Sequence, residues 1–461
     1  MPEHPTRYVA ERVCEVGLVD APPEAVRIAK DTFLDTVGCM LAGSAEPGGR
    51  KIADFARRMG SGPASIVGRP ERVSSYMAAL ANGTSAALLD FDDTNWRLIG
   101  HPSGSLVPAV VAIGEERRVS GRAALEAYMV GFEAVTKIAR GLMPGMHTHG
   151  RHSTGALGVF GATAACAKLL QLDATQTATA FGIAASCSGA LQGNWGSMTK
   201  GLHSGEAAAN GLMSARLAAD GFTARPDIFE CKYGFAQTGV LDGSARLDEI
   251  GRDFANPWDC VDPGVGIKLF PSGTVSFCAG ECALELVTRH AFEPSAIESV
   301  EWRMTGPGYG LSRFPVPNDP EEAYYSTPWA IAAGLVDRKI GLAQFSAERI
   351  GDPAVRALCA KVKLSVHPDF VTVDDPKDNV AGELVVRLKD GRELRHFRRR
   401  PRAYPGGEPW TRDQLLGKYR EAAGRALDPE CVERSIELLS EIETLPNLTE
   451  LTEMLRPVAA P

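Results

Sequence analysis

The stretch PPEAVRIAKDTFLDTVGCMLAG, residues 22–43, indicates the fold class of this chain. It opens on proline, repeats apolar residues at helical spacing and ends at glycine, which predicts an α-helix. The same pattern returns in four further segments of the N-terminal half, at 121–142, 158–172, 173–191 and 204–222. Because small residues lie on several faces of these segments, we expect closely packed and mostly buried helices.

The character of the sequence changes after Pro257. Residues 297–304, IESVEWRM, alternate in polarity like a strand, and residues 382–397 are typical of a hairpin with its turn at Asp390-Gly391. Helical segments lie between these strands, and the pattern is helical again from Trp410 onward. The central part of the chain therefore predicts an α+β module between two helical parts.

Two domains account for this order of segments. A chain of 461 residues is longer than one compact domain usually is. We expect a mainly α protein in which both chain ends, residues 1–262 and 405–461, build a large all-α helical domain. A smaller α+β lid domain, residues 263–404, is inserted between them.

Composition excludes several classes of partner. The net charge of −8 argues against nucleic-acid binding and against an anionic membrane surface. No apolar run reaches the length of about 18 residues that a membrane span requires, and the N-terminal residues contain no apolar signal core. The ten cysteines form no C-x-x-C pair, which predicts a reduced, cytoplasmic protein without an iron–sulfur cluster.

Four glycine-rich segments combine polar and reactive side chains. They are LLDFDDTNWRLIGHPSGS (88–105), HTHGRHSTGALG (147–158), GNWGSMTKGLHSGEA (193–207) and GIKLFPSGT (266–274). Five of the nine histidines fall in the first three segments, namely His101, His147, His149, His152 and His203. This clustering points to a shared site more than to five unrelated surface positions.

The acidic stretch DFDDTN, residues 90–95, is open to three interpretations. Carboxylates with nearby histidines are able to hold a metal, but neither H-E-x-x-H nor a calcium-loop pattern occurs. The pattern D-x-D-x-T also occurs in phosphatases, where a buried strand precedes it, whereas here the small, helix-prone ANGTSAALL does. The third interpretation is acid–base chemistry on a carbon next to a carboxylate.

Such carbon-acid chemistry needs cations to hold carboxylates and groups that move protons. Histidine titrates near neutral pH and is the natural proton carrier. The sequence supplies each kind of group: Lys200 and Lys268 as cations, His101 and His152 as base and acid in either order, Asp90 to orient a histidine, and Thr94 to bind a substrate oxygen.

These segments resemble the MmgE/PrpD family, whose members include 2-methylcitrate dehydratase, cis-aconitate decarboxylase and iminodisuccinate epimerase. The similarity runs from DTVGCMLAG (35–43) through DFDDTN, GHPSGS, GRHSTGALG, MTKGLHSGEA and KLFPSG to EEAYYSTPWAIAAGLVD (321–337). It implies a helical domain with an α+β lid, a homodimer, and a site between the domains that needs no organic cofactor. The family's site residues fall on Asp90, Thr94, His101, His152, Lys200 and Lys268.

Two departures from the family pattern concern the lid. Gly273 and Phe277 stand where some members carry a histidine, and Trp329 is the best match to the site tyrosine of the decarboxylase. A missing lid histidine favours an epimerase over the two other activities, because an epimerase needs only two proton-transfer groups. It also leaves room for a catalytically inactive member that serves as a binding subunit.

The sequence thus predicts a cytoplasmic, metal-independent and cofactor-independent lyase, a dehydratase acting on a small di- or tricarboxylate of the 2-methylcitrate type. The alternatives are an epimerase of an iminodisuccinate-like acid and a decarboxylase of the cis-aconitate type. The predicted catalytic residues are His101, His152, Lys200 and Asp90, and the predicted substrate-binding residues are Thr94, Lys268, Ser272, Trp329 and His203. Asp92 and Asp93 are expected to support the loop.

Overall fold

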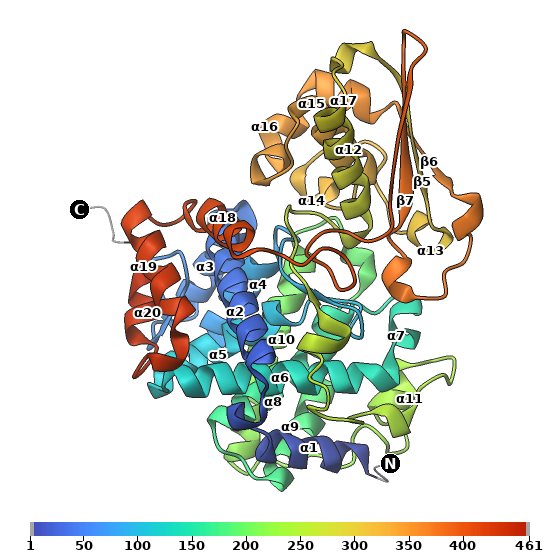
Figure 1. Cartoon of the computed structure of the whole chain (residues 1–461). Coiled ribbons are helices and arrows are strands. Elements are labelled where there is room, and N and C mark those ends of the chain that lie inside the picture. Colours follow the sequence, from blue (N-terminus) through green and yellow to red (C-terminus); the bar gives the residue numbers. More distant parts are fainter. Residues whose placement is uncertain (1–3, 458–461) are drawn as a thin grey trace.

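Helices dominate the computed structural model, which describes residues 4–457 (Figure 1). The predicted mainly α fold is therefore confirmed. We call the large helical part the body. Its N-terminal elements are α1 (Pro5–Glu15), α2 (Pro23–Ser44), α3 (Pro47–Arg58), α4 (Ser75–Ala87), α5 (Ser103–Arg117), α6 (Gly121–Leu142), α7 (Gly145–Thr148), α8 (Ser153–Leu169), α9 (Ala174–Ser186), α10 (Thr199–Ala219) and α11 (Phe235–Gly239).

Helix α10 forms the centre of the body, where it packs against α4 and α8. All three helices are rich in alanine, glycine and serine, so their backbones approach closely, as the small residues in the sequence predict. Helix α10 begins at Thr199, five residues earlier than the sequence pattern indicates. Lys200 and His203 therefore lie in the first turns of a rigid helix and not in a loop.

The C-terminal helices return to the body. They are α18 (Arg412–Ala423), α19 (Pro429–Ser440) and α20 (Thr449–Met454), and α18 and α19 pack on α2 (Figure 1). A buried ion pair between Lys418 and Asp35, 2.6 Å apart, joins the two chain ends. Both ends thus contribute to the body, while the division at 262/263 and 404/405 stays a prediction.

We call the smaller part above the body the lid (Figure 1). Its sheet has the order β6-β5-β7-β8, in which β5 and β6 are parallel and the other pairs antiparallel. Trp302 on β5 is fully buried, facing the helices that pack on the sheet. The strands are β5 (Ile297–Met304), β6 (Val362–Val366), β7 (Gly382–Leu388) and β8 (Glu393–Arg398); the helices are α12 (Phe277–Arg289), α13 (Gly306–Tyr309), α14 (Pro320–Ala323), α15 (Thr327–Asp337), α16 (Ala347–Ile350) and α17 (Pro353–Cys359).

The predicted strand at 297–304 and the predicted hairpin at 382–397 are confirmed. The strand β6 was not predicted from the sequence. Its five residues, VKLSV, are only partly buried and are too short for a clear alternation. The helix expected over 320–340 is broken between α14 and α15, at residues 324–326. That break positions Tyr325, which becomes important below.

Two short ladders lie outside the lid sheet. One pairs β1 (Ala64–Ser65) with β2 (Arg72–Val73), and the other pairs β3 (Thr94–Asn95) with β4 (Val265–Gly266), both antiparallel. The second ladder joins the acidic segment to the strand that leads into the lid. It brings Lys268, which is distant in sequence, to Asp90.

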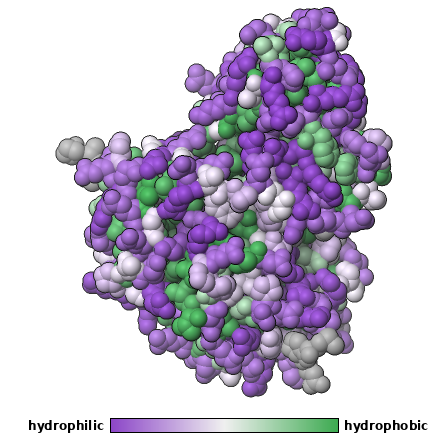
Figure 2. Space-filling model, in the orientation of Figure 1, coloured by the Kyte–Doolittle hydropathy of each residue, from purple (hydrophilic) through white to green (hydrophobic). Residues whose placement is uncertain are grey.

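Hydrophilic residues cover most of the face seen in Figure 2, and apolar residues are scattered over it in small patches. Among residues 4–457, no helix has the length and apolar character needed to cross a membrane.

Candidate active site

Asp90 is the centre of a buried charged cluster. It follows α4, is only 2% exposed and adopts a left-handed backbone conformation with φ 47°, which aspartate tolerates better than most residues. Its Oδ1 atom lies 2.7 Å from Lys200 Nζ, 3.0 Å from Lys268 Nζ and 3.3 Å from His101 Nε2. Three residues from three separate segments therefore meet at one carboxylate oxygen.

The two lysines differ in what their ammonium hydrogens do. Lys268 Nζ donates to the carbonyl oxygens of Asp90 and Ser272, both at 2.9 Å, and forms an ion pair with Asp90 Oδ1 at 3.0 Å, so three protein oxygens surround it. Lys200 Nζ donates to Asp90 Oδ1 and to the carbonyl oxygen of Ala87 at 3.3 Å. One hydrogen of Lys200 is left for another acceptor.

Charge pairing governs the protonation of this cluster. Burial by itself opposes ionisation of Asp90, but the ammonium groups of Lys200 and Lys268 outweigh it and hold the pKa of Asp90 far below its usual range. Burial likewise disfavours the charged form of Lys200, yet Asp90 and Asp92 raise its pKa. The pKa of Lys268 is lowered, by burial first and by the neighbouring Lys200.

His101 is held as a neutral ring with its lone pair directed at the cluster. Its Nδ1 lies 2.8 Å from the carbonyl oxygen of Asp93, which only accepts, so Nδ1 carries the hydrogen. Nε2 then carries the lone pair on the side of Asp90. Burial is the main cause that lowers the pKa of His101 to about 4, with Lys268 and Lys200 acting in the same direction. The His101 ring is therefore neutral at neutral pH, and Nε2 is its nitrogen able to accept a proton.

His152 and His203 form a hydrogen-bonded pair, with their Nδ1 atoms 2.9 Å apart. Burial lowers the pKa of His152 well below the usual value and that of His203 to about 4. With both rings neutral, one Nδ1 donates and the other accepts. One Nε2 then carries a hydrogen and the other a lone pair, so a proton taken up at one ring can leave from the other.

Three helices begin at this cluster. His101 precedes the start of α5 by two residues, His152 is the N-cap of α8, and Lys200 is the second residue of α10. The backbone N–H of His101 donates to Thr154 Oγ1 at 3.0 Å, which ties the starts of α5 and α8 together. Helix N-termini carry partial positive charge, so this arrangement favours an anionic ligand.

Asp92 and Asp93 take different roles. Asp93 caps α5, accepting from the backbone N–H of Ser103 at 3.1 Å and from its hydroxyl at 2.6 Å, as expected for a loop-supporting residue. Burial and the nearby Asp92 raise the pKa of Asp93 to about 8. Asp92 lies 3.5 Å from His101 Nδ1, and within residues 4–457 neither of its carboxylate oxygens has a hydrogen-bond partner.

Thr94 lies on β3 at the edge of the cluster and is 9% exposed. It is paired with Gly266, where a Cβ atom would stand 2.8 Å from both Thr94 Oγ1 and the Tyr404 ring. Glycine is needed at this position because a larger residue would push the hydroxyl away. Tyr404 in turn places its hydroxyl 3.3 Å from Thr274 Oγ1.

The remaining predicted residues are placed less directly. The backbone N–H of Ser272 donates to the Asp90 carbonyl, and its hydroxyl donates to the Tyr324 carbonyl at 3.1 Å. Trp329 is fully buried in the lid, with its indole N–H on the Gln344 carbonyl at 3.1 Å. Within residues 4–457, Trp329 forms no hydrogen bond with the other predicted site residues. Its role in substrate binding therefore stays a prediction.

Two aromatic residues near the cluster, Trp195 and Tyr325, carried only weak signals in the sequence, where Trp195 suits a pocket wall or simple packing and Tyr325 a polar substitute for the missing lid histidine. Trp195 packs edge-on against His152, with ring centroids 5.6 Å apart, and stacks on Tyr325 of the lid at 5.8 Å. In the sequence, Trp195 is only a tryptophan in a glycine-rich loop, and such a residue serves packing as often as it lines a site.

Asp90, Asp92 and His101 each offer an atom able to bind a metal, and these atoms lie within 4.8 Å of one another. The surroundings fit a dication poorly. Lys200 and Lys268 already share Asp90 Oδ1, and their positive charges would repel a second cation there.

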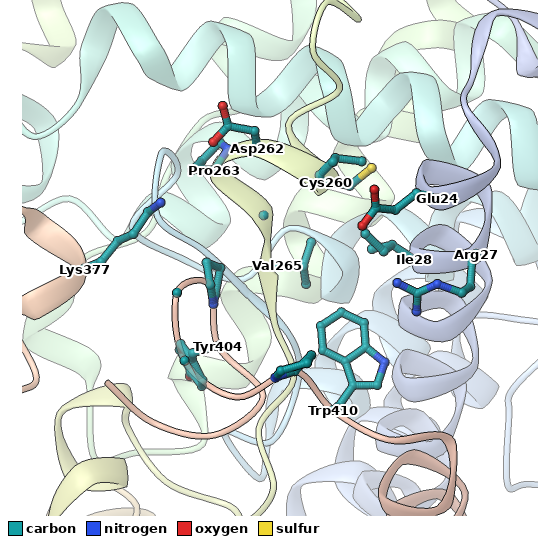
Figure 3. A pocket seen from close by; sticks show the side chains of 16 residues that line it. Glu24, Arg27, Ile28, Cys260, Asp262, Pro263, Val265, Lys377, Tyr404 and Trp410 are labelled. Carbon is teal, nitrogen blue, oxygen red and sulfur yellow. The ribbon is translucent and has the colours of Figure 1, made fainter. Parts of the chain in front are cut away.

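A cleft with a volume of about 540 Å³ lies between the body and the lid. Leu88 and Met198 line it from the body, and Tyr324 and Phe345 line it from the lid. Within the described part of the chain, its walls include none of the predicted site residues, although Leu88 and Met198 each precede a residue of the cluster by two positions. A separate cavity of about 360 Å³ opens beside Tyr404 and Trp410 (Figure 3). Among the described residues, its walls include none of those predicted for the site.

The three buried histidines predict an acid-sensitive stability. Unfolded histidine titrates near 6.5, while His101 and His203 titrate at about 4 in the folded protein. Between these values the unfolded chain binds more protons, so the free energy of unfolding falls as the pH falls from about 6.5 to about 4. With His152 included, we expect a slope of up to about 4 kcal/mol per pH unit.

Urea unfolding at pH 7.0, 5.5 and 4.5 measures this slope. The variant His203→Asn should reduce it, whereas His149→Asn, at the exposed C-terminal end of α7, should not. An equal slope in all three proteins would mean that the buried histidines are not its cause.

A helical body and an α+β lid enclose a buried cluster of one carboxylate, two lysines and three histidines, which are the kinds of group that acid–base chemistry uses. The family model described as the MmgE/PrpD N-terminal domain matches residues 7–246, and that of the MmgE/PrpD C-terminal domain matches residues 270–444. The chain belongs to the MmgE/PrpD family.

Curated relatives agree with this assignment. Cis-aconitate decarboxylase from Mus musculus is 29% identical over 447 residues, covering 94% of this chain and 89% of the relative. The enzyme of the same name from Homo sapiens is 29% identical and covers 95% and 91%. That from Aspergillus terreus is 25% identical and covers 96% and 94%. The family and these relatives make this chain an enzyme of the lyase type.

Proposed function

We propose that this enzyme is a hydro-lyase acting on a small tricarboxylate of the citrate type, from which it removes water next to a carboxylate. One observation carries this proposal: the neutral His101 ring presents the lone pair of Nε2 beside a carboxylate held by two lysines. Dehydration begins with removal of a proton from carbon, and a free base at neutral pH is what that step requires.

Binding of the substrate is assigned to Lys200 and to the helix N-termini. The remaining N–H of Lys200 donates to the carboxylate next to the reacting carbon, and the positive ends of α5, α8 and α10 favour the other negative charges. Thr94 binds a substrate oxygen through its hydroxyl. Three protein oxygens surround Lys268 Nζ, so we propose that it holds Asp90 and the 268–272 loop in place.

Proton transfer then follows the geometry of the histidines. His101 Nε2 takes the proton from carbon, and the charge that develops on the adjacent carboxylate is stabilised by Lys200. The His152–His203 pair delivers a proton to the departing hydroxyl, which leaves as water. The pair takes up its replacement through His203, and His101 releases its proton after product departs.

A second candidate is decarboxylation of a cis-aconitate-like tricarboxylate. It is favoured by the names of the relatives, which are decarboxylases covering nearly the whole chain. In this case the carbon would lose CO₂ and the histidine pair would protonate the carbanion that remains. Lys200 and the helix N-termini would still hold the remaining carboxylates.

The test is a panel of acids followed by proton NMR in D₂O, with the protein at neutral pH. Citrate, 2-methylcitrate, cis-aconitate and aspartate-like dicarboxylates form the panel. A new alkene signal with no gas release marks the hydro-lyase, and CO₂ release marks the decarboxylase. Deuterium uptake without a net product marks an epimerase and would overturn both. No spectral change with any acid of the panel would favour a catalytically inactive member of the family that only binds acids.

We propose that the reaction is independent of a metal, because two ammonium groups occupy the side of Asp90 where a dication would bind. The same panel with EDTA added should give unchanged rates. Rates that vanish with EDTA and return with Zn²⁺ or Mg²⁺ would contradict this.

Assembly as a homodimer and a cytoplasmic location stay predictions from the sequence. Light scattering on the purified chain measures the first, and a mass of one chain would contradict it.

A further inference from the structure

Tyr325 stands between the lid and the cluster and has an unused polar group. Its side chain is 8% exposed, and its hydroxyl is buried without a hydrogen-bond partner among residues 4–457. A buried hydroxyl without a partner costs free energy, so such groups commonly serve a ligand. Tyr325 lies within the break between α14 and α15, and its side chain reaches Trp195 of the body.

The ring of Tyr325 is fixed by contacts with both parts of the protein. It stacks almost parallel on Trp195 of the body, at 5.8 Å and 8°. Its carbonyl accepts from the backbone N–H of Arg313, whose guanidinium lies 4.7 Å from the centroid of the Trp195 ring and donates to the Gln192 carbonyl at 3.0 Å. Stacking and cation–π contact together hold the ring in one orientation.

Gly273 explains how the tyrosine reaches the cluster. A Cβ atom at position 273 would stand 3.7 Å from Tyr325 Cδ1 and 3.8 Å from Asp90 Oδ2. The space beside Gly273 therefore borders both the Tyr325 ring and the central carboxylate. Trp195 in turn packs on His152, so its indole links Tyr325 to the predicted proton donor.

We propose that Tyr325 supplies the lid's contact to the substrate, donating a hydrogen bond from its neutral phenol to a carboxylate that Lys200 does not hold. The inference rests on the proposed function, since it assumes a tricarboxylate in the cluster. Burial, with Asp90 and Asp92, raises the pKa of Tyr325 well above its usual value, so the hydroxyl keeps its hydrogen at working pH. Tyr325 then determines specificity for three carboxylates over two.

The variant Tyr325→Phe tests this, because it keeps the stacked ring and removes only the hydroxyl. A hydrogen bond to a charged group contributes enough for about a 10- to 100-fold loss of kcat/KM with a tricarboxylate substrate. The matched control is Tyr309→Phe, a tyrosine of the lid at the end of α13 whose side chain is exposed. That control should keep the kcat/KM of the wild type.

Equilibrium binding separates a substrate contact from a structural role. Calorimetry with tricarballylate and with succinate, which has one carboxylate fewer, measures the Kd values of the wild type and Tyr325→Phe. We expect the variant to raise the Kd of tricarballylate by about 10- to 100-fold and the Kd of succinate by less than about 3-fold. Equal weakening of both ligands, or of neither, would overturn the proposal. Because binding needs no turnover, this result stands even if no acid in the panel reacts.

Discussion

His101→Asn should lower kcat by about 10³-fold while leaving the protein folded. The amide nitrogen of asparagine stands near the place of Nδ1 and is able to keep the bond to the Asp93 carbonyl, which spans 2.8 Å in the wild type. The lone pair of Nε2 is lost, and with it the base. General base catalysis contributes about 10²- to 10⁴-fold in enzymes. Initial rates with the active acid of the panel measure the loss, and the midpoint of urea unfolding reports the fold.

His149→Asn is the matched control for this variant. His149 also has its Nδ1 on a backbone carbonyl, that of Gly145 at 2.6 Å, but it lies exposed at the end of α7. We expect wild-type kcat from it. Activity of His101→Asn within about threefold of the wild type would remove His101 from the mechanism and leave the histidine pair as the source of the base.

Variants of the two lysines should have different effects, with Lys200→Met lowering activity and Lys268→Met lowering stability. Lys200→Met leaves Asp90 paired with Lys268, so the protein should stay folded while kcat/KM falls by at least about 100-fold, because the hydrogen that binds substrate is gone. Lys268→Met removes two buried hydrogen bonds and an ion pair at once and should lower the free energy of unfolding by about 3–5 kcal/mol. Urea titration and initial rates on the same samples measure both effects.

Lys137→Met provides the control for burial. Lys137 is fully buried and paired with Asp259 at 2.8 Å, away from the cluster. This variant should lose stability, yet the molecules that remain folded should turn over at the wild-type rate. A Lys268→Met protein that is as stable as the wild type, but has lost affinity for tricarballylate, would show that Lys268 binds substrate after all.

Much of the architecture was accessible from the sequence, because local patterns encode helices and hairpins. Apolar spacing and end signals located α2 and α6 to within one residue at each end, and Asp390-Gly391 located the hairpin. The strand β6 was missed because its partner β5 lies about 60 residues away, and parallel pairing leaves no local signal. The start of α10 was missed because its first turn follows a glycine-rich loop.

The residues of the candidate site were also predicted in part from the sequence, whereas their protonation and hydrogen bonding were not. Residue types and loop composition indicated Asp90, His101, His152 and Lys200 as one group, and the geometry places them around a single carboxylate and a histidine pair. The sequence alone did not indicate which lysine has a free hydrogen, or which nitrogen of His101 carries the lone pair. Those properties depend on hydrogen bonds to backbone carbonyls, which are invisible until the chain is folded.

The sequence by itself determined the fold class, the two kinds of module and the identity of the polar residues, because each rests on local pattern or composition. Only the tertiary structure decided how these residues act. Burial holds the histidines neutral, and the ammonium groups of Lys200 and Lys268 hold Asp90 ionised. The break before α15 places Tyr325 beside Gly273 and Trp195. Electrostatic and hydrogen-bonding environments are properties of atoms that are distant in sequence and adjacent in space.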